Sequence, residues 1–600
     1  MTDRFTRLRR MVAAGIAAVG ILAPMAVQGV PAYPGIIKST QPDGTVVEIL
    51  LRGDERGHRI LTTDGYLLMR DSEGYIAYAE ADANGMPIAS AMRPSATAST
   101  RTSAEAAFVA ALDQKKIASA FEQAELMRSC STRAGGENPR YLFSGAAFPA
   151  KGNSRGLVVL VEFQDKAFSM DDPQGYFSRM LNESGFSDLG ATGSARDFFI
   201  ENSNGIFSPQ FDVYGPIKLA ERMVHYGGND FHNNDMHPEE MVIEACQALD
   251  DTVDFSIYDI NNDGQIDNVF VIYAGYGEAD SGMPNTVWPH SANILDYQLG
   301  TDYFFDGKLL NRYACTNEVD HQYSRADGIG TFVHEFSHVM GLPDLYATGS
   351  SMAFTPGAFS TLDMGPYNNQ GRTPPHYSSF ERYCLDWLEP EYLTEAGVYR
   401  LEPIHKSNKA YIIGTDKDTE FYLLENRQQE CCDAYLPGHG LMVWHVDYVQ
   451  NVWDNNIINN RAAHQYVDLI EADCDTKEQS RAGDLFPGTS NVMEFTRTSI
   501  PALRAWSGVP IGLGLRGIRE EDGVVEFSVV TDNSGVDTAL ADDAIRVEAD
   551  FIYNTSGSRA TVFDLTGARV ADVAPSSGVR LPAGIYIVTG AGVSRKVVLR

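Results

Sequence analysis

Cysteine is scarce in this chain, whose 600 residues include only 7 cysteines. Disulfide bonds are therefore not the main source of stability, and hydrophobic cores must supply it. Basic side chains are also few: 47 lysines and arginines stand against 80 aspartates and glutamates, a net charge of -33. Because a surface this acidic repels phosphate backbones and suits divalent cations, we expect no nucleic-acid partner.

Long apolar runs are absent except near the N-terminus. There, four arginines precede the apolar run Met11–Val27 and small residues follow it, an order typical of a secretory signal peptide. We assign residues 1–32 to this signal, with cleavage after either Gly29 or Ala32. An uncleaved anchor is the alternative, although about 17 apolar residues that include Pro24 are few for a membrane span. The protein should be secreted or held at the cell surface, without a stable span after signal removal.

Hydrophobic patterning predicts a multidomain chain. Gly156–Phe163 and Asn268–Ala274 are continuous apolar runs, typical of strands buried on both faces, and helical stretches accompany them. From Gly397 onward, short alternating runs predict an all-β region. The expected units are an N-terminal unit at 33–136, an α/β (α+β) unit at 137–395, a β-rich accessory unit at 396–531, a linker at 532–548 and a small C-terminal β-sandwich at 549–600.

The segment Thr331–Tyr346, TFVHEFSHVMGLPDLY, carries the clearest chemical signal. In a helix, His334 and His338 project from one face, so that both imidazoles can reach one metal ion. In zinc hydrolases with this spacing, the residue at the position of Glu335 is the general base that takes a proton from a metal-bound water. The pattern therefore predicts zinc-dependent hydrolysis.

The residues after this helix extend the motif. Gly341 and Pro343 end the helix, and the turn brings Asp344 within reach as a third, oxygen ligand. A bare HExxH also occurs on polar helix faces, but the longer HExxHxxGxxD favours a zinc site. Met364 lies in a Gly-Pro turn that matches the Met-turn beneath the metal of metzincins. Tyr367 is a candidate phenol donor to the oxyanion, with packing as the alternative role.

A second candidate site is the loop DINNDGQID. Its oxygen-bearing side chains are Asp259, Asn261, Asp263 and Asp267, with a glycine at the sixth place, a spacing that wraps a loop around calcium. The twelfth place holds Phe270 where an EF-hand has glutamate, and a strand follows, so the loop is not an EF-hand. The alternative is a plain Asp/Asn/Gly turn that leads into the strand.

These motifs resemble the immune inhibitor A family of secreted zinc metallopeptidases. The resemblance covers about residues 150 to 530. It implies a metzincin-like catalytic domain, endopeptidase activity on proteins, catalytic zinc with Asp344 as third ligand, and structural calcium. The segments that carry it are His334–Tyr346, Asp363–Gly365, Leu157–Asp165, Ser194–Gly205, Tyr258–Gly282, Glu425–Gln428 and Leu436–Tyr448.

The resemblance also implies synthesis as a zymogen. Residues 33–136 would then be an inhibitory propeptide, released by cleavage near Arg133 or Arg140 in the polar, Gly-rich segment Ser129–Pro139. A thiolate from Cys130 is one candidate for zinc's open position before cleavage.

The last block, Ala549–Arg600, resembles the C-terminal sorting domains of exported Bacteroidetes proteins. The matching segments are ATVFDLTGARV at Ala560–Val570 and LPAGIYIVTG at Leu581–Gly590. This resemblance implies an outer-membrane secretion machinery as a partner.

Together these features predict a secreted zinc-dependent endopeptidase that acts on extracellular proteins and is made as a zymogen. One rival is a secreted calcium-binding surface protein with a vestigial zinc site, but such a site has no chemical need for Glu335. The other rival is a glycan hydrolase, which requires a separated carboxylate pair that sequence cannot identify.

Overall fold

The structure is a computed structural model. It describes residues 28–55, 57–82, 86–126, 141–143, 148–230, 233–348, 353–531, 545–548, 551–554, 559–564, 568–582, 584–590 and 593–599. Four parts of the predicted organisation lie outside these residues: the signal segment before Gln28, Cys130, the cleavage region 129–140, and residues 532–544 of the linker predicted at 532–548. Two compact units are formed, one from residues 1–394, 399–493 and 517–527, the other from 395–398, 494–516 and 528–600.

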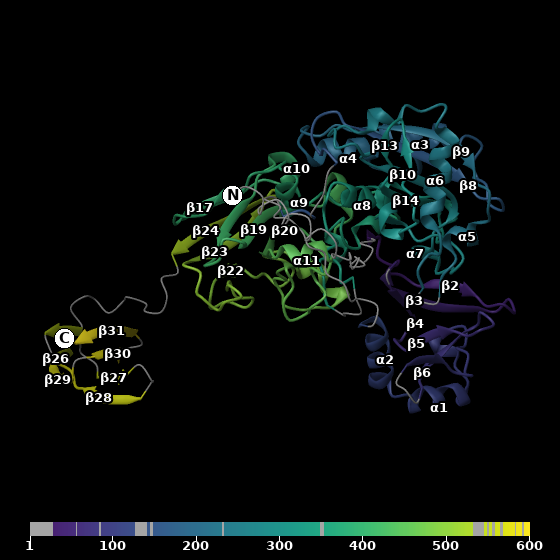
Figure 1. Cartoon of the computed structure of the whole chain (residues 1–600). Coiled ribbons are helices and arrows are strands. Elements are labelled where there is room, and N and C mark those ends of the chain that lie inside the picture. The colour runs from purple at the N-terminus through teal and green to yellow at the C-terminus, as the bar shows by residue number, and fades with distance from the viewer. Residues whose placement is uncertain are drawn as a thin grey trace, which may run out of the picture. The chain divides into compact units, whose positions relative to one another are not determined.

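A mixed seven-stranded sheet forms the framework of the α/β region (Figure 1). Four strands are parallel: β9 (Gln210–Lys218), β8 (Arg155–Glu162), β10 (Val269–Tyr276) and β14 (Arg312–Asp320). Next to β14, β11 (His290–Asn293) runs antiparallel, and β15 (Arg325–Ala326) also pairs with β14. The two buried strands predicted from apolar runs are confirmed as β8 and β10.

Helices cover both faces of this sheet. Alternate residues of each strand point to opposite faces, so each strand contributes side chains to two cores. Val158 and Leu160 of β8 belong to a core with Phe336 of α8 (Ile329–Val339). Leu157 of β8 belongs instead to a second core with α6 (Pro238–Leu249). The other α-helices described between residues 148 and 390 are α3 (Pro173–Asn182), α4 (Ala195–Asn202), α5 (Met223–Gly227), α7 (Glu278–Ser281) and α9 (Ser379–Cys384).

The N-terminal unit is an antiparallel six-stranded sheet followed by two helices. Its strands run in chain order through the sheet: β2 (Ile37–Thr40), β3 (Val46–Asp54), β4 (Gly57–Thr62), β5 (Leu67–Arg70), β6 (Ile76–Ala81) and β7 (Pro87–Ala89). The helices are α1 (Ser103–Ala111) and α2 (Gln114–Leu126). Ahead of this sheet, β1 (Gln28–Gly29) pairs antiparallel with β11 and so extends the α/β sheet.

The β-rich region after residue 396 shares its core with the α/β region. A five-stranded sheet contains β16 (Glu391–Tyr392), β18 (Tyr411–Gly414), β19 (Glu420–Arg427), β20 (Gly440–Asp447) and β21 (Val467–Leu469). Trp444 of β20 and Leu423 of β19 belong to the same hydrophobic core as Phe336. The unit boundary expected near residue 395 therefore does not separate two cores. The composition changes there because helices give way to strands, while burial continues.

The remaining elements of this region are two short helices and a four-stranded sheet. They are α10 (Ile404–Ser407), α11 (Gln450–Asp454), β17 (Gly397–Leu401), β22 (Glu494–Phe495), β23 (Leu513–Glu521) and β24 (Val524–Thr531). In the α/β region, β12 (Phe304–Phe305) and β13 (Lys308–Leu309) form a separate two-stranded sheet. Among the described residues, no helix has both the length and the apolar character that a bilayer crossing requires.

The C-terminal block has the two-sheet form expected of a small β-sandwich. One sheet contains β25 (Ile545–Glu548), β26 (Phe551–Asn554) and β29 (Ser577–Arg580). Since β25 pairs with β26, residues 545–548 belong to this block and not to the predicted linker. The other contains β28 (Arg569–Val573), β27 (Ala560–Asp564), β30 (Gly584–Gly590) and β31 (Val593–Leu599). Ile552 of the first sheet and Val562 and Val588 of the second share one core.

Candidate metal centre

Helix α8 contains three of the predicted site residues, His334, Glu335 and His338. All of its residues are buried, and Phe332 and Phe336 anchor one side in the aromatic core around Phe211. This packing turns the opposite side, with His334 and His338, toward the loop that follows. Gly341 has a φ of +100°, a left-handed conformation that glycine adopts without a steric cost, so the helix ends and the chain turns back here.

The turn places the three predicted zinc ligands together. The Nε2 atoms of His334 and His338 are 3.2 Å apart, and Asp344 Oδ1 lies 3.3 Å and 3.2 Å from them. These three side chains, the His334 cluster, are fully buried. Asp344 Oδ1 has no hydrogen-bond partner among the described residues. A buried lone pair that faces two imidazole nitrogens fits a bound cation, and two nitrogens with one oxygen suit zinc.

Backbone carbonyls orient both imidazoles. The Nδ1 of His334 lies 2.8 Å from Thr361 O, and the Nδ1 of His338 lies 2.8 Å from Leu342 O. A carbonyl can only accept, so each Nδ1 carries the proton and each Nε2 presents its lone pair to the cluster. Burial lowers the pKa of His334, which favours the neutral form that ligates metals. Thr361 belongs to the turn that contains Met364, so this turn supports the cluster through its backbone.

Asn456 holds the third ligand from a distant part of the chain. Its Oδ1 accepts the backbone N–H of Asp344 at 2.9 Å, and its Nδ2 donates to Asp344 Oδ2 at 2.5 Å. Although burial opposes ionisation, His338 and His334 hold the pKa of Asp344 well below its usual range. No sequence motif pointed to Asn456, which lies 112 residues from Asp344.

Glu335 faces the N-terminal segment instead of solvent. Its Oε1 accepts the backbone N–H of Val30 at 2.7 Å, while Oε2 has no hydrogen-bond partner among the described residues. Burial raises the pKa of Glu335 well above its usual value, and the charges of Asp344 and Glu55 add to this effect. A carboxylate with a raised pKa and one unused oxygen is suited to accept a proton.

Three side chains donate hydrogen bonds to the backbone carbonyls of residues 29–31. Tyr346 donates its phenol to Gly29 O at 2.6 Å, and Tyr367 donates to Pro31 O at 2.6 Å. Trp288 donates its indole N–H to Val30 O at 2.9 Å. The phenol of Tyr367 therefore acts as a donor to a backbone carbonyl, whereas Tyr346 and Trp288 were not found from the sequence.

The loop predicted to bind calcium satisfies much of its charge internally. Asp259 accepts the N–H groups of Asp263 and Gly264, and Lys308 Nζ lies 2.6 Å from its Oδ2. Asn261 Oδ1 accepts the Asp263 N–H at 2.8 Å. These contacts fit the plain-turn alternative.

Asp267 differs from the rest of the loop. Its Oδ2 accepts the Ile260 N–H, but its Oδ1 is buried without a hydrogen-bond partner among the described residues. Burial raises its pKa to about 7, and the negative charges of Asp263 and Asp259 contribute. A cation beside Asp267 would reverse this shift. Asp267 is therefore the residue of the loop that favours calcium over the plain turn.

Comparison with known proteins agrees with this geometry. Residues 151–392 match the model of the immune inhibitor A peptidase M6 catalytic domain. The pre-pro-metalloprotease PrtV of Vibrio cholerae serotype O1 is 27% identical over an alignment of 246 residues, and the match covers 35% of this chain and 27% of PrtV. Immune inhibitor A of Bacillus thuringiensis subsp. alesti is 24% identical over an alignment of 267 residues, and the match covers 37% of this chain and 38% of that protein. The matched part of the chain thus covers well under half of each relative, and the matches support a metalloendopeptidase.

Proposed function

We propose that this protein is a secreted zinc-dependent endopeptidase that hydrolyses peptide bonds of extracellular proteins. The observation that carries the proposal is the His334 cluster, in which two imidazoles and one carboxylate direct unshared lone pairs at one buried point. The match of residues 151–392 to a peptidase catalytic domain supports the same activity.

The roles of the residues follow from their positions. His334, His338 and Asp344 hold the zinc ion, with Asn456 fixing the carboxylate. Zinc, when bound, polarises the scissile carbonyl and acidifies water. Glu335 takes the proton of the attacking water and passes it to the leaving amine. Tyr367 donates its phenol toward the oxygen that becomes negative, as it now donates to Pro31 O.

The zymogen proposal has its support in residues 30 and 31. The Val30 N–H donates to Glu335, Val30 O accepts from the Trp288 indole and Pro31 O accepts from the Tyr367 phenol. This segment therefore occupies the place that a substrate backbone needs. Residues 33–136 would keep this segment in place as a propeptide until cleavage near Arg133 or Arg140. Latency then needs no thiol, so Cys130→Ala should stay as latent as the parent.

This contact sets a condition on signal removal. Cleavage after Ala32 would discard Val30, whereas cleavage after Gly29 leaves Val30 as the new N-terminus, with its amine beside Glu335. We therefore propose that the signal ends at Gly29. N-terminal sequencing of the latent protein checks this directly: Val30 as the first residue supports the proposal, and Tyr33 contradicts it.

The remaining assignments complete the proposal. Residues 137–395 form the catalytic domain, 396–531 the β-rich accessory region and 549–600 a sorting-type sandwich that the outer-membrane secretion machinery recognises. Calcium binds the 259–267 loop, and Asp267 is the ligand whose raised pKa the cation reverses. Deleting 549–600 should leave peptidase activity per molecule near normal but keep the protein inside the cell envelope.

The test of the activity is hydrolysis of a peptide library by the processed protein. We expect cleavage that a zinc chelator abolishes and added zinc restores. A processed, zinc-loaded protein that cleaves no peptide or protein substrate would contradict the proposal and favour the calcium-binding surface protein.

A further inference from the structure

A second group of metal-ligand atoms lies outside the His334 cluster. It consists of Glu201 at the end of α4, His376 in the loop before α9, and Cys432 in the short helix Cys431–Tyr435. One ligand atom from each of the three side chains lies within 4.8 Å of the other two. His376 Nε2 is 3.0 Å from Glu201 Oε1, and Cys432 Sγ is 4.0 Å from Glu201 Oε2.

His376 is arranged as a metal-binding histidine. Its side chain is fully buried, and Nε2 has no well-directed hydrogen bond among the described residues despite its closeness to Glu201. On the other side of the ring, Nδ1 lies 3.2 Å from Asp433 Oδ2. Metal-bound histidines commonly have a carboxylate on the nitrogen away from the metal, which fixes the ring and raises its basicity.

Asp433 is itself rigidly held. The backbone N–H of His376 donates to Asp433 Oδ1 at 2.9 Å, and Arg427 Nε donates to Asp433 Oδ2 at 2.7 Å. Arg427 is fully buried, so it has no alternative partner in solvent. The carboxylate thus has its charge balanced by Arg427 and serves to orient the imidazole.

Cys432 belongs to the edge of the hydrophobic core, and its thiol donates to Glu201 Oε2. Its thiol is buried next to Glu201 and Asp433, and burial together with these carboxylates raises its pKa well above the usual value. A metal ion reverses this effect, because a coordinated thiol ionises and the carboxylate charge becomes favourable.

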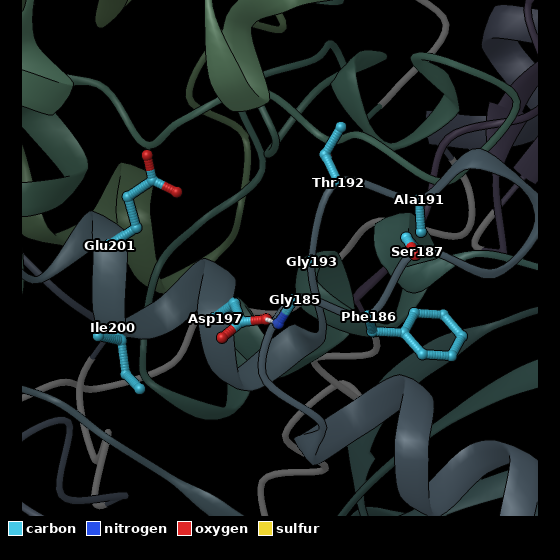
Figure 2. A pocket seen from close by; sticks show the side chains of 9 residues that line it. All are labelled: Gly185, Phe186, Ser187, Ala191, Thr192, Gly193, Asp197, Ile200 and Glu201. Carbon is cyan, nitrogen blue, oxygen red and sulfur yellow. Dashed lines mark hydrogen bonds between the residues drawn. The ribbon is translucent and has the colours of Figure 1, made fainter.

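Solvent reaches the cluster from the Glu201 side. The Glu201 side chain is 35% exposed and lines an open pocket of about 540 Å³ together with Asp197 and Ile200 of the same helix (Figure 2). A fourth coordination position is therefore open to water or to a small ligand from this pocket.

We propose that Glu201, His376 and Cys432, the His376 cluster, bind a second zinc ion. Thiolate, imidazole and carboxylate are the donor set that zinc prefers, and four-coordinate zinc with these ligands separates the donor atoms by about 3.3 to 3.8 Å. The 3.0 Å separation of His376 Nε2 and Glu201 Oε1 must widen slightly to reach this range. The Cys432 thiol, 4.0 Å from Glu201 Oε2 and within 4.8 Å of a His376 nitrogen, must move closer. The rival arrangement is a metal-free one, in which a protonated His376 bridges Glu201 and Asp433.

The consequence of this site is a cross-link within the first compact unit. It ties α4, which lies in the segment matched to the catalytic domain, to Cys432 beyond that segment. The second metal site is also connected to the active-site helix α8. Tyr377, the neighbour of His376 in the chain, shares a hydrogen bond with Ser337 of α8. The second zinc would stabilise the loop behind the His334 cluster.

The test is cobalt substitution in the reduced full-length protein. The three ligands of the His334 cluster include no sulfur, and a Cys130→Ala background removes the thiol that is a candidate for its open position. In that background a thiolate-to-cobalt charge-transfer band reports the His376 cluster. We expect two cobalt ions per chain and this band in the parent. Cys432→Ser should lose the band and one equivalent of metal, whereas Cys431→Ser, which changes the adjacent exposed cysteine, should keep both.

His376→Gln provides a second, independent variant that retains the thiol. It should also lose one metal equivalent and the parent band while unfolding cooperatively. No band in the fully loaded parent, or a band that persists in Cys432→Ser, would overturn the proposal and favour the metal-free bridge. Neither outcome depends on peptidase activity, so this test is separate from that of the proposed function.

Discussion

The His334 cluster and the His376 cluster use similar ligand atoms but are assembled in different ways. In the first, two ligands occupy one face of α8 and the third lies in the turn that ends it. In the second, Glu201 and Cys432 are 231 residues apart and meet only through tertiary packing. The surroundings also differ, since Asp344 is held by the neutral Asn456 and Asp433 by the charged Arg427.

The two clusters therefore depend on different parts of the fold. Formation of α8 and its exit turn already brings the His334 cluster close to its final geometry, so a distant change should weaken it through Asn456 or through the turn that contains Thr361. The His376 cluster requires α4, the loop before α9 and the β-rich region at once. Losing either ion should therefore have separable effects on chemistry and on stability.

The largest effect is expected for His338→Ala, which removes a ligand of the first cluster. Peptidase activity should be lost, and bound zinc should fall from two ions to one. The thiolate-to-cobalt band should remain, because the His376 cluster is untouched. Metal analysis and spectroscopy of the same sample check this. Loss of both ions would show that the clusters are not independent.

A smaller effect is expected for Asn456→Ala, which leaves all ligands in place. Removing a residue that orients a metal ligand typically lowers metal affinity by about 10- to 100-fold. Competition with a chelator measures this. The matched control is Asn455→Ala, whose side chain bonds to Asn451, and it should bind zinc like the parent. Equal affinities for both variants would contradict the role of Asn456.

A moderate loss of latency is expected for Trp288→Phe. This change removes the indole N–H that Trp288 donates to Val30 O at 2.9 Å, so the segment is held less firmly beside Glu335. The unprocessed protein should then show measurable activity. The double variant with Glu335→Ala should stay inactive. Latency unchanged from the parent would contradict the role of this segment.

The smallest effect concerns calcium and pH. Because the pKa of Asp267 is raised to about 7, the folded protein binds a proton there that the unfolded chain releases, and stability falls as pH rises from about 4 to 7. Calcium should therefore raise the melting temperature more at pH 8 than at pH 5. Asp267→Asn should remove this pH dependence. A melting temperature indifferent to calcium at both pH values would favour the plain turn.

Local spacing explains how much could be predicted from the sequence. The ligands of the His334 cluster and the strands β8 and β10 follow from periodicity over a few residues. Asn456 and Val30 could not be found, because they reach the site from 112 and 305 residues away. The shared core of the α/β and β-rich regions was missed for the same reason, since a change in composition does not reveal which elements pack together.

The central claim is that Glu335 is the general base beside a zinc ion held by the His334 cluster. The most direct test is the turnover of processed Glu335→Ala, compared with the parent at equal zinc content. We predict that the variant keeps its zinc and its melting temperature but loses activity on the order of a hundredfold or more. Normal turnover in the zinc-loaded variant would contradict the account.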